Sequence, residues 1–285
     1  MNREPRDPRT PPRLLTIAGS DSGGGAGLQA DLKAFAAHGV YGMSAVTAVT
    51  VQNTRGVTAV HAVPAAVVAA QIDAVLDDIG ADAIKIGMLG DAAVVRAVAG
   101  RLRAHLGSGG GERLGIPVVL DPVLVAKGGA PLLADEAVAA LIAELLPLAT
   151  VVTPNLPELE RLSGRPVATE EERRRAAEAL ARPGSQGPAV LAKGGHTLED
   201  AGPDVVDLLL AGEIWYRFAH PRLAVRSTHG TGCTLAAALA ARLAMGEALP
   251  AAAAGAIEYV AGAIAAAYPL GGGIGPVDPL YRFKM

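Results

Sequence analysis

The chain has 285 residues, of which 51% are hydrophobic and 19% are charged, and its formal net charge is −3 at pH 7. This length and apolar content can bury a substantial core, while the near-neutral charge and the 3% aromatic content disfavour nucleic-acid binding. The single cysteine excludes an intramolecular disulfide, and the absence of a membrane-spanning or signal-peptide pattern predicts a cytoplasmic protein without membrane contact. Residues 1–12 are predicted to form a disordered extension before a single domain, 13–285.

Runs of β-branched residues alternate along the chain with longer alanine-rich segments of helical length. The expected strands are Leu14–Ala18, Ser44–Gln52, Val57–Ala62, Ala83–Ile86, Pro117–Leu120, Val151–Thr153, Ala189–Leu191, Val205–Leu210 and Ile214–Phe218. The expected helices are Leu28–Ala37, Pro64–Asp78, Asp91–His105, Asp135–Leu146, Pro157–Ser163, Glu170–Ala181, Thr231–Met245 and Leu249–Tyr268, with Asp135 and Thr169 at helix starts. This alternation predicts an α/β fold in which helices cover both faces of a mostly parallel sheet.

A first glycine-rich loop, Gly19–Gly27, separates the expected strand Leu14–Ala18 from the following helix. α/β proteins place ligands at such strand-to-helix turns. The loop is neither a P-loop nor a good dinucleotide fingerprint, because no Gly-Lys-Ser/Thr follows it and no acidic residue closes a plausible second strand.

A second glycine-rich segment, Ser227–Thr234, stands directly before the helical run Leu235–Met245. The first turn of a helix has backbone N–H groups without intrahelical partners, and glycines let that backbone approach an anion closely. Cys233 would then lie beside a bound phosphate. In the alternative interpretation, the glycines only shape a turn and Cys233 is a small buried apolar residue.

Polar residues follow three of the expected strands. Asp121 ends one strand, Asn155 and Glu158 follow the next, and Lys193 follows a third. Taken singly, they can be a turn cap, a capping box and a solvated lysine. Taken together with the two glycine loops, they supply the metal site, cation and anion cradle that phosphoryl transfer from a nucleotide requires.

Several ordered motifs then identify a resemblance that runs from Leu14 to Asp278. The motifs are Ala18–Lys33, Lys85–Leu89, Leu120–Val123, Thr153–Glu158, His229–Thr234 and Gly272–Val277. The chain resembles the hydroxymethylpyrimidine and hydroxymethylpyrimidine-phosphate kinases of thiamine biosynthesis, which belong to the ribokinase-like superfamily. The resemblance implies a ribokinase-like three-layer α/β/α fold, a homodimer, ATP with Mg²⁺, and two successive phosphorylations of a small-molecule pyrimidine.

The resemblance also implies roles for individual residues. The pyrimidine is expected among Gly19, Asp31, Gln52, Met88 and Val123. Gln52 is the leading specificity residue because its amide both donates and accepts hydrogen bonds, and Met88 offers a polarizable face to the ring. For Asp31 the alternative is an exposed helical carboxylate.

On the nucleotide side, the resemblance assigns ATP to Lys193, Asn155, Thr228 and Gly230, and the metal to Glu158 and Asp121. Glu158 is expected to act through metal-bound water. The catalytic set is Cys233 with the turn Gly230, Thr231 and Gly232. The resemblance makes Cys233 the base, with its thiolate favoured by the amino terminus of the helix.

Two other functions stay open at this stage. A pyridoxal or pyridoxine kinase on the same fold would bind a similar heteroaromatic ring, and a few pocket contacts decide between the two substrates. A non-catalytic pyrimidine sensor would keep the pocket without turnover. His196 and His229 are adjacent to the loops. We expect these histidines to shape a turn or to contact phosphate rather than to act as bases.

Overall fold

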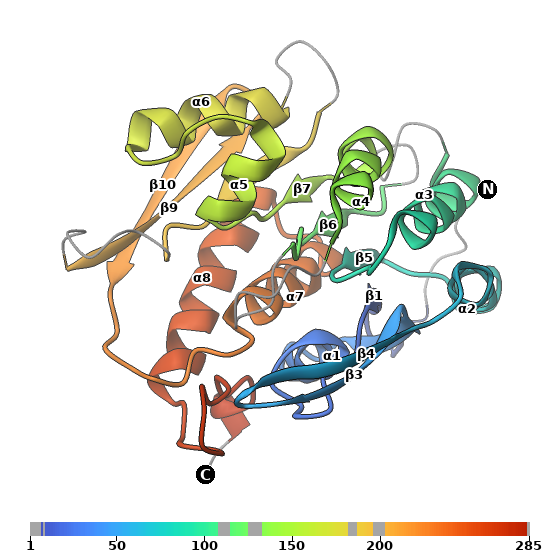
Figure 1. The fold of residues 1–285 in the computed structure, drawn as a ribbon, viewed down its shortest axis with the longest axis horizontal. Coiled ribbons are helices and arrows are strands. Elements are labelled where there is room, and N and C mark those ends of the chain that lie inside the picture. Colours follow the sequence, from blue (N-terminus) through green and yellow to red (C-terminus); the bar gives the residue numbers. More distant parts are fainter. Residues whose placement is uncertain are drawn as a thin grey trace.

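An eight-stranded sheet runs through the centre of the protein, in a computed structural model that describes residues 7, 9–107, 115–124, 133–181, 187–195 and 203–283 (Figure 1). Its strand order is β10-β9-β8-β7-β6-β5-β1-β2. All pairs from β2 to β8 are parallel, and β9 is antiparallel to both of its neighbours. The strands of this sheet are β1 (Arg13–Ala18), β2 (Tyr41–Val46), β5 (Ala83–Ile86), β6 (Val118–Leu120), β7 (Val151–Val152), β8 (Ala189–Ala192), β9 (Asp204–Ala211) and β10 (Ile214–Pro221).

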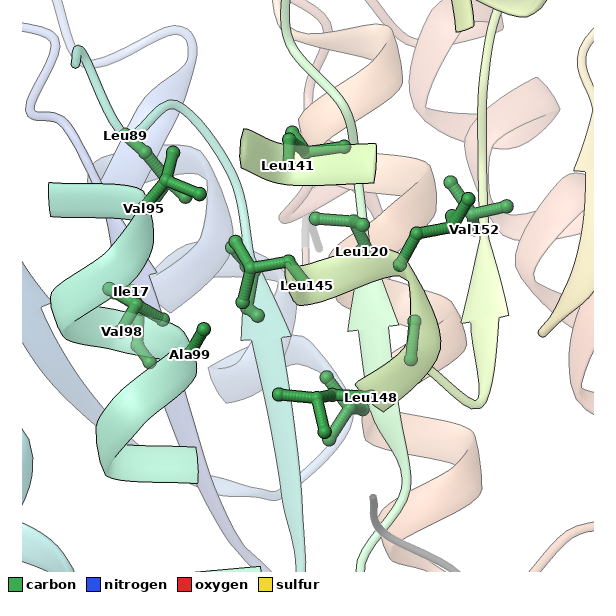
Figure 2. Packing of buried hydrophobic residues seen from close by; sticks show 14 of the residues in the cluster. Ile17, Leu89, Val95, Val98, Ala99, Leu120, Leu141, Leu145, Leu148 and Val152 are labelled. Carbon is green, nitrogen blue, oxygen red and sulfur yellow. The ribbon is translucent and has the colours of Figure 1, made fainter. Parts of the chain in front are cut away.

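Helices pack on both faces of the sheet, because alternate residues of each buried strand point to opposite sides. On one face, Leu120 and Val152 pack with residues of α3 and of the segment after α4, as Figure 2 shows. On the other face, Val119 and Val151 pack against α7 and α8. The helices are α1 (Gly27–Ala37), α2 (Ala65–Asp78), α3 (Ala92–Leu106), α4 (Asp135–Ala140), α5 (Leu156–Ser163), α6 (Glu170–Ala181), α7 (Thr231–Ala244) and α8 (Leu249–Ala265). The predicted three-layer α/β/α architecture is confirmed.

The predicted strand Ser44–Gln52 is wrong, because the chain leaves the main sheet at Thr47. β2 pairs with β1, whereas β3 (Ala48–Asn53) forms a separate antiparallel ribbon with β4 (Gly56–Ala62), visible in Figure 1. Thr47 is fully buried, and its hydroxyl donates to the Met88 carbonyl at 2.6 Å. A continuous β-branched run does not reveal such a change of sheet, since both halves favour extended backbone.

The predicted helix starts at Asp135 and Thr169 are confirmed. Thr169 forms a capping box with Glu172, in which each side chain receives the other's backbone N–H at 3.2 and 2.9 Å. The helix that begins at Asp135 is shorter than predicted, because after Ala140 the chain continues as a π turn and then a 3₁₀ turn. Pro147 lacks the N–H that a continuing α-helix needs. The last long helix ends at Ala265 rather than Tyr268.

The predicted extension 1–12 lies largely outside the described residues, since 1–6 and 8 are not among them. We infer that 13–285 is one domain, because a single sheet takes strands from Arg13 to Pro221 and the later helices α7 and α8 pack on it. None of the helices in the described ranges has both the length and the apolar character needed to cross a membrane.

Candidate active site

The carboxyl ends of the parallel strands carry a row of polar side chains on the face that α7 covers. Val119 packs under α7, so Asp121, two residues later, extends from the same face. The Asp121 side chain is buried and accepts hydrogen bonds from Thr153 Oγ1 at 3.2 Å and Lys193 Nζ at 3.0 Å, both through Oδ1. The structure therefore brings together Asp121 and Lys193, which are 72 positions apart in the sequence.

Asn155 and Glu158 begin α5 as a complete capping box. Asn155 Oδ1 accepts from the Glu158 amide at 3.0 Å, and Glu158 Oε2 accepts from the Asn155 amide at 2.8 Å. Glu158 is only 5% exposed, and burial raises the pKa of its carboxyl to about 7, a rise that Lys193 opposes and Asp121 increases. The capping interpretation is thus confirmed. Metal binding by Glu158 stays a prediction.

The turn before α7 lies against the first glycine loop and above the polar row. Gly230 has φ +80°, and a Cβ there would lie 1.8 Å from the carbonyl oxygen of Gly25, so only glycine fits. A Cβ on Gly232 would lie 3.3 Å from Lys193 Nζ. Thr231 Oγ1 donates to the Thr228 carbonyl at 2.8 Å, which tightens the turn. The first backbone amides of α7 therefore lie next to the Lys193 ammonium, where an anion would bind.

Cys233 is partly exposed in the first turn of α7. Burial raises the pKa of its thiol to about 11, with Asp31 and Asp121 adding to the rise and Lys85 and a hydrogen bond from the Gly27 amide opposing it. The pKa of the thiol is therefore raised rather than lowered, and the role of Cys233 as base stays a prediction. The pKa rises because desolvation and two nearby carboxylates outweigh the positive groups.

Four of the predicted pyrimidine contacts surround the loops that meet this turn. A Cβ on Gly19 would lie 3.3 Å from Met88 Sδ, which places these two residues together. Gln52 Nε2 lies 3.2 Å from His229 Nε2, so β3 reaches the residue that precedes Gly230. The Val123 amide donates to the Asp121 carbonyl at 2.9 Å.

The family model for phosphomethylpyrimidine kinase matches residues 21–278, which contain this whole constellation except Gly19. The chain belongs to the phosphomethylpyrimidine kinase family. A hydroxymethylpyrimidine/phosphomethylpyrimidine kinase of Streptomyces coelicolor is 50% identical over 274 residues, which are 96% of each chain. The thiamine biosynthesis bifunctional protein ThiED of Geobacter sulfurreducens is also 50% identical, and the match covers 93% of this chain and 51% of that protein.

Among solved structures, the pyridoxal kinase of Staphylococcus aureus in complex with AMP-PCP and pyridoxal has a TM-score of 0.83 and 34% identity. The match covers 96% of this chain and 95% of that chain. The predicted resemblance, the ribokinase-like fold and the kinase activity are confirmed for this member of the phosphomethylpyrimidine kinase family.

Asp31 is not the exposed carboxylate of the alternative interpretation. Its side chain is fully buried, and Oδ2 accepts from Thr16 Oγ1 at 2.6 Å and from Lys85 Nζ at 2.9 Å. The alternative of an exposed helical carboxylate is therefore wrong. A direct pyrimidine contact stays a prediction, but no atom of the Asp31 side chain reaches the surface of the site in this phosphomethylpyrimidine kinase family member.

The structure also shows a functional link that the sequence reasoning missed. Asp21 accepts hydrogen bonds from the amides of Gly23, Gly25 and Ala26, and its Oδ2 lies 2.9 Å from His229 Nε2. Although burial by itself raises the pKa of Asp21, the bonds from His229 and the backbone outweigh it and lower that pKa. The two glycine loops are thereby tied together, and the only signal in the sequence was an aspartate inside the first loop. His196 lies outside the described residues.

Proposed function

We propose that this kinase transfers the γ-phosphoryl group of ATP to the hydroxymethyl group of 4-amino-5-hydroxymethyl-2-methylpyrimidine, and then to the resulting monophosphate, in thiamine diphosphate biosynthesis. The observation that carries the proposal is the position of the α7 turn. It lies between the Lys193–Asp121 pair on one side and the loops holding Met88 and Gln52 on the other. A phosphoryl group held there lies between a nucleotide site and a small-molecule site. The names of the 50% identical relatives support the same substrate.

The pyrimidine side of the site would be formed by small, polarizable and amide groups. Gly19 leaves space against Met88, since a side chain there would press on Sδ at 3.3 Å. Gln52 is only partly buried, and its amide can read the aminopyrimidine edge. Val123 is also partly exposed, next to Asp121. These contacts orient the hydroxymethyl group toward the α7 turn.

The nucleotide side would hold ATP through Lys193, Asn155, Thr228 and the Gly230 turn. The AMP-PCP complex of the Staphylococcus aureus pyridoxal kinase supports ATP as the nucleotide. The donor set fits Mg²⁺. Two buried carboxylates, Asp121 and Glu158, have Lys193 as a shared cation, and burial, followed by the charge of Asp121, raises the pKa of Glu158 against the opposing effect of Lys193. Mg²⁺ is commonly held by one or two carboxylates together with phosphates. When bound, it neutralises charge on the phosphates.

During transfer, the amides of Gly230, Thr231 and Gly232 would stabilise negative charge on the transferring group. Cys233 would remove the proton of the attacking hydroxymethyl group in the first reaction. Because its thiol pKa is about 11, only a small fraction is thiolate at neutral pH, and the first transfer should accelerate as the pH rises. The monophosphate is already anionic, so the second transfer depends less on Cys233.

The test is ADP release by purified protein with ATP and Mg²⁺, comparing hydroxymethylpyrimidine, its monophosphate and pyridoxal at equal concentration. Turnover of both pyrimidines well above pyridoxal is expected. The similarity to a solved pyridoxal kinase makes pyridoxal the second candidate substrate, and a preference for it would overturn the proposal. Binding of a pyrimidine without ADP formation would instead favour a sensor.

We also infer a cytoplasmic homodimer. The resemblance stated above supports dimerisation, and the described helices include no membrane-spanning candidate. Sedimentation equilibrium of the full chain should give twice the monomer mass of 28.7 kDa. A monomer mass at micromolar concentration would contradict the dimer without affecting the assignment of the reaction.

A further inference from the structure

His229 lies where three segments that are distant in the sequence meet. Its backbone is held by the late glycine-rich segment, because its amide donates to the Gly275 carbonyl at 2.9 Å and its carbonyl accepts from the Val277 amide at 3.1 Å. Its ring packs on the first glycine loop, since a Cβ on Gly25 would lie 2.6 Å from Cδ2. The side chain is only 14% exposed. The ring is therefore fixed in place directly before the α7 turn, which continues with Gly230.

The carboxylate of Asp21 decides which nitrogen of His229 carries a hydrogen. Asp21 is buried, and its two oxygens accept from the amides of Gly23, Gly25 and Ala26 at 2.8, 3.1 and 2.8 Å. Three N–H groups aimed at two oxygens favour the ionised carboxylate, which only accepts hydrogen bonds. His229 Nε2 lies 2.9 Å from Asp21 Oδ2, so this nitrogen carries a hydrogen and donates it.

The amide of Gln52 contacts the same nitrogen. Its Nε2 lies 3.2 Å from His229 Nε2, and its Oε1 lies 3.2 Å from Thr50 Oγ1. In this orientation two N–H groups face each other at His229. The single proton of the Thr50 hydroxyl also has a shorter contact, at 2.8 Å, with the Ser20 carbonyl.

Turning the Gln52 amide by 180° satisfies both contacts. Its oxygen then accepts from His229 Nε2–H, as the second acceptor beside Asp21, and its nitrogen donates to Thr50 Oγ1, whose own proton stays on the Ser20 carbonyl. The oxygen and nitrogen of a glutamine amide have nearly the same shape, so their hydrogen-bond partners decide which atom points where. Asp21 thus determines, through His229, how Gln52 is oriented.

We propose that His229 is a positioning residue that, together with Thr50, locks the Gln52 amide with its oxygen toward the α7 turn. The inference rests on the proposed function, in which Gln52 reads the pyrimidine. The lock leaves one lone pair and one N–H of the amide for the ligand. A 4-aminopyrimidine offers a donor amino group beside an acceptor ring nitrogen, whereas the 4-oxo analogue offers an acceptor carbonyl beside a ring N–H. A freely turning amide reads both patterns. The locked amide selects the 4-amino ring.

Calorimetric binding of hydroxymethylpyrimidine and its 4-oxo analogue, without ATP, tests the lock. The wild type should prefer the 4-amino ring about 10²-fold, within the range of a mismatched specificity contact. In His229→Leu the preference should fall about tenfold, because the freed amide lets the 4-oxo analogue bind more tightly. General damage to the site would weaken both ligands instead. His229→Gln offers an N–H that Asp21 orients as a donor, and it should keep most of the wild-type preference.

Thr50→Val releases the other end of the Gln52 amide without altering His229, and it should lower the preference in the same way. It serves also where His229→Leu does not fold. His105→Leu is the matched control, because it breaks a histidine–aspartate contact of similar length, 2.8 Å from Nε2 to Asp73 Oδ1, between α3 and α2. This control should bind both rings like the wild type.

An unchanged preference in folded Thr50→Val or His229→Leu would overturn the inference, as would a wild type that binds both rings equally. The proposed function has a separate readout, ADP release. A wild type that prefers the 4-amino ring but forms no ADP from ATP would overturn the proposed function and leave the lock supported.

Discussion

The two faces of the central sheet are made by the same strands and yet have different tasks. Leu120 points into the layer of α3 and the segment after α4, where Figure 2 shows it among other buried hydrophobic residues. Asp121, the next residue, lies on the opposite side among Thr153 and Lys193. A core residue, Leu120, and a residue of the candidate site, Asp121, are therefore neighbours in the sequence, because side chains of a strand alternate between faces. Changes on the two faces should damage different properties.

The largest effect is expected from Asp121→Asn, among the polar groups that follow the strands on the α7 side of the sheet. The amide keeps the shape of the carboxylate but removes the charge that Lys193 pairs with and that Mg²⁺ would contact. We expect kcat to fall about 10³-fold, the scale of losing a strong electrostatic group in a catalytic site. The unfolding midpoint should fall less than in a core truncation, because Glu158 still faces the Lys193 ammonium when Asp121 has lost its charge. Steady-state ADP release and thermal denaturation of the same preparation test both statements, and a large loss of stability with modest loss of kcat would contradict the division of faces.

Leu120→Ala makes the reciprocal change on the apolar face. Leu120 is fully buried, and its truncation leaves a cavity between β6 and the neighbouring helical layer. The free energy of unfolding should fall by about 2–5 kcal/mol. At a temperature where the variant is folded, kcat per active molecule should stay within about twofold of the wild type. Urea denaturation measures the free energy of unfolding. Titration of the active sites gives the concentration of active protein from which kcat is calculated.

Cys233→Ala distinguishes the two phosphoryl transfers. The first phosphorylation should slow about 10²-fold, the usual contribution of a general base, whereas the second should slow much less. In the wild type, the single-turnover rate of the first transfer should rise with pH between 7 and 10, because the thiol pKa is about 11 and the deprotonated form is the active one. The variant should lose this rise. Equal losses in both transfers would exclude Cys233 as base.

Gln52→Leu should change substrate choice more than catalysis. The side chain lies within reach of His229 and at the edge of the loops that hold Met88. Losing its hydrogen bonds should lower kcat/KM for hydroxymethylpyrimidine about 10- to 100-fold, which corresponds to the 1–3 kcal/mol of a specificity contact. The value for pyridoxal should change less. Competition between the two acceptors in one reaction mixture measures this ratio directly, and parallel losses would argue against a specificity role.

The smallest effect concerns the turn after Lys193. Asp207 accepts a hydrogen bond from the Gly194 amide at 2.7 Å. Its Oδ2 also lies 3.4 Å from His220 Nε2, and the interaction with Asp207 raises the pKa of His220. The pair therefore stabilises the fold below pH 6.5, and its contribution disappears as the pH rises through the higher pKa of the folded state. His220→Gln should cost about 0.5–1 kcal/mol at pH 6 and almost nothing at pH 9. Chemical denaturation at both pH values tests the sign.

Much of the fold could be predicted because its local signals agree with one another. Short segments of sequence specify the glycine loops, the capping residues and the alternation of strands and helices, as the capping box at Thr169 illustrates. The chain's departure from the sheet at Thr47 could not be predicted, since both halves of that run favour extended backbone. The pairing register between strands that are distant in the sequence decides which half of the run remains in the main sheet. That register depends on packing across the sheet.

The site shows the same division. The order of residue types along the chain predicts that Asp121, Glu158, Lys193 and Cys233 lie near one edge of the sheet. Their hydrogen-bond partners and their pKa values depend on the folded structure. It buried Asp31 with Lys85, tied His229 to Asp21, and raised the pKa of the Cys233 thiol instead of lowering it. The physical reason is that burial and charge pairing depend on groups far apart in the chain, so no local pattern contains them.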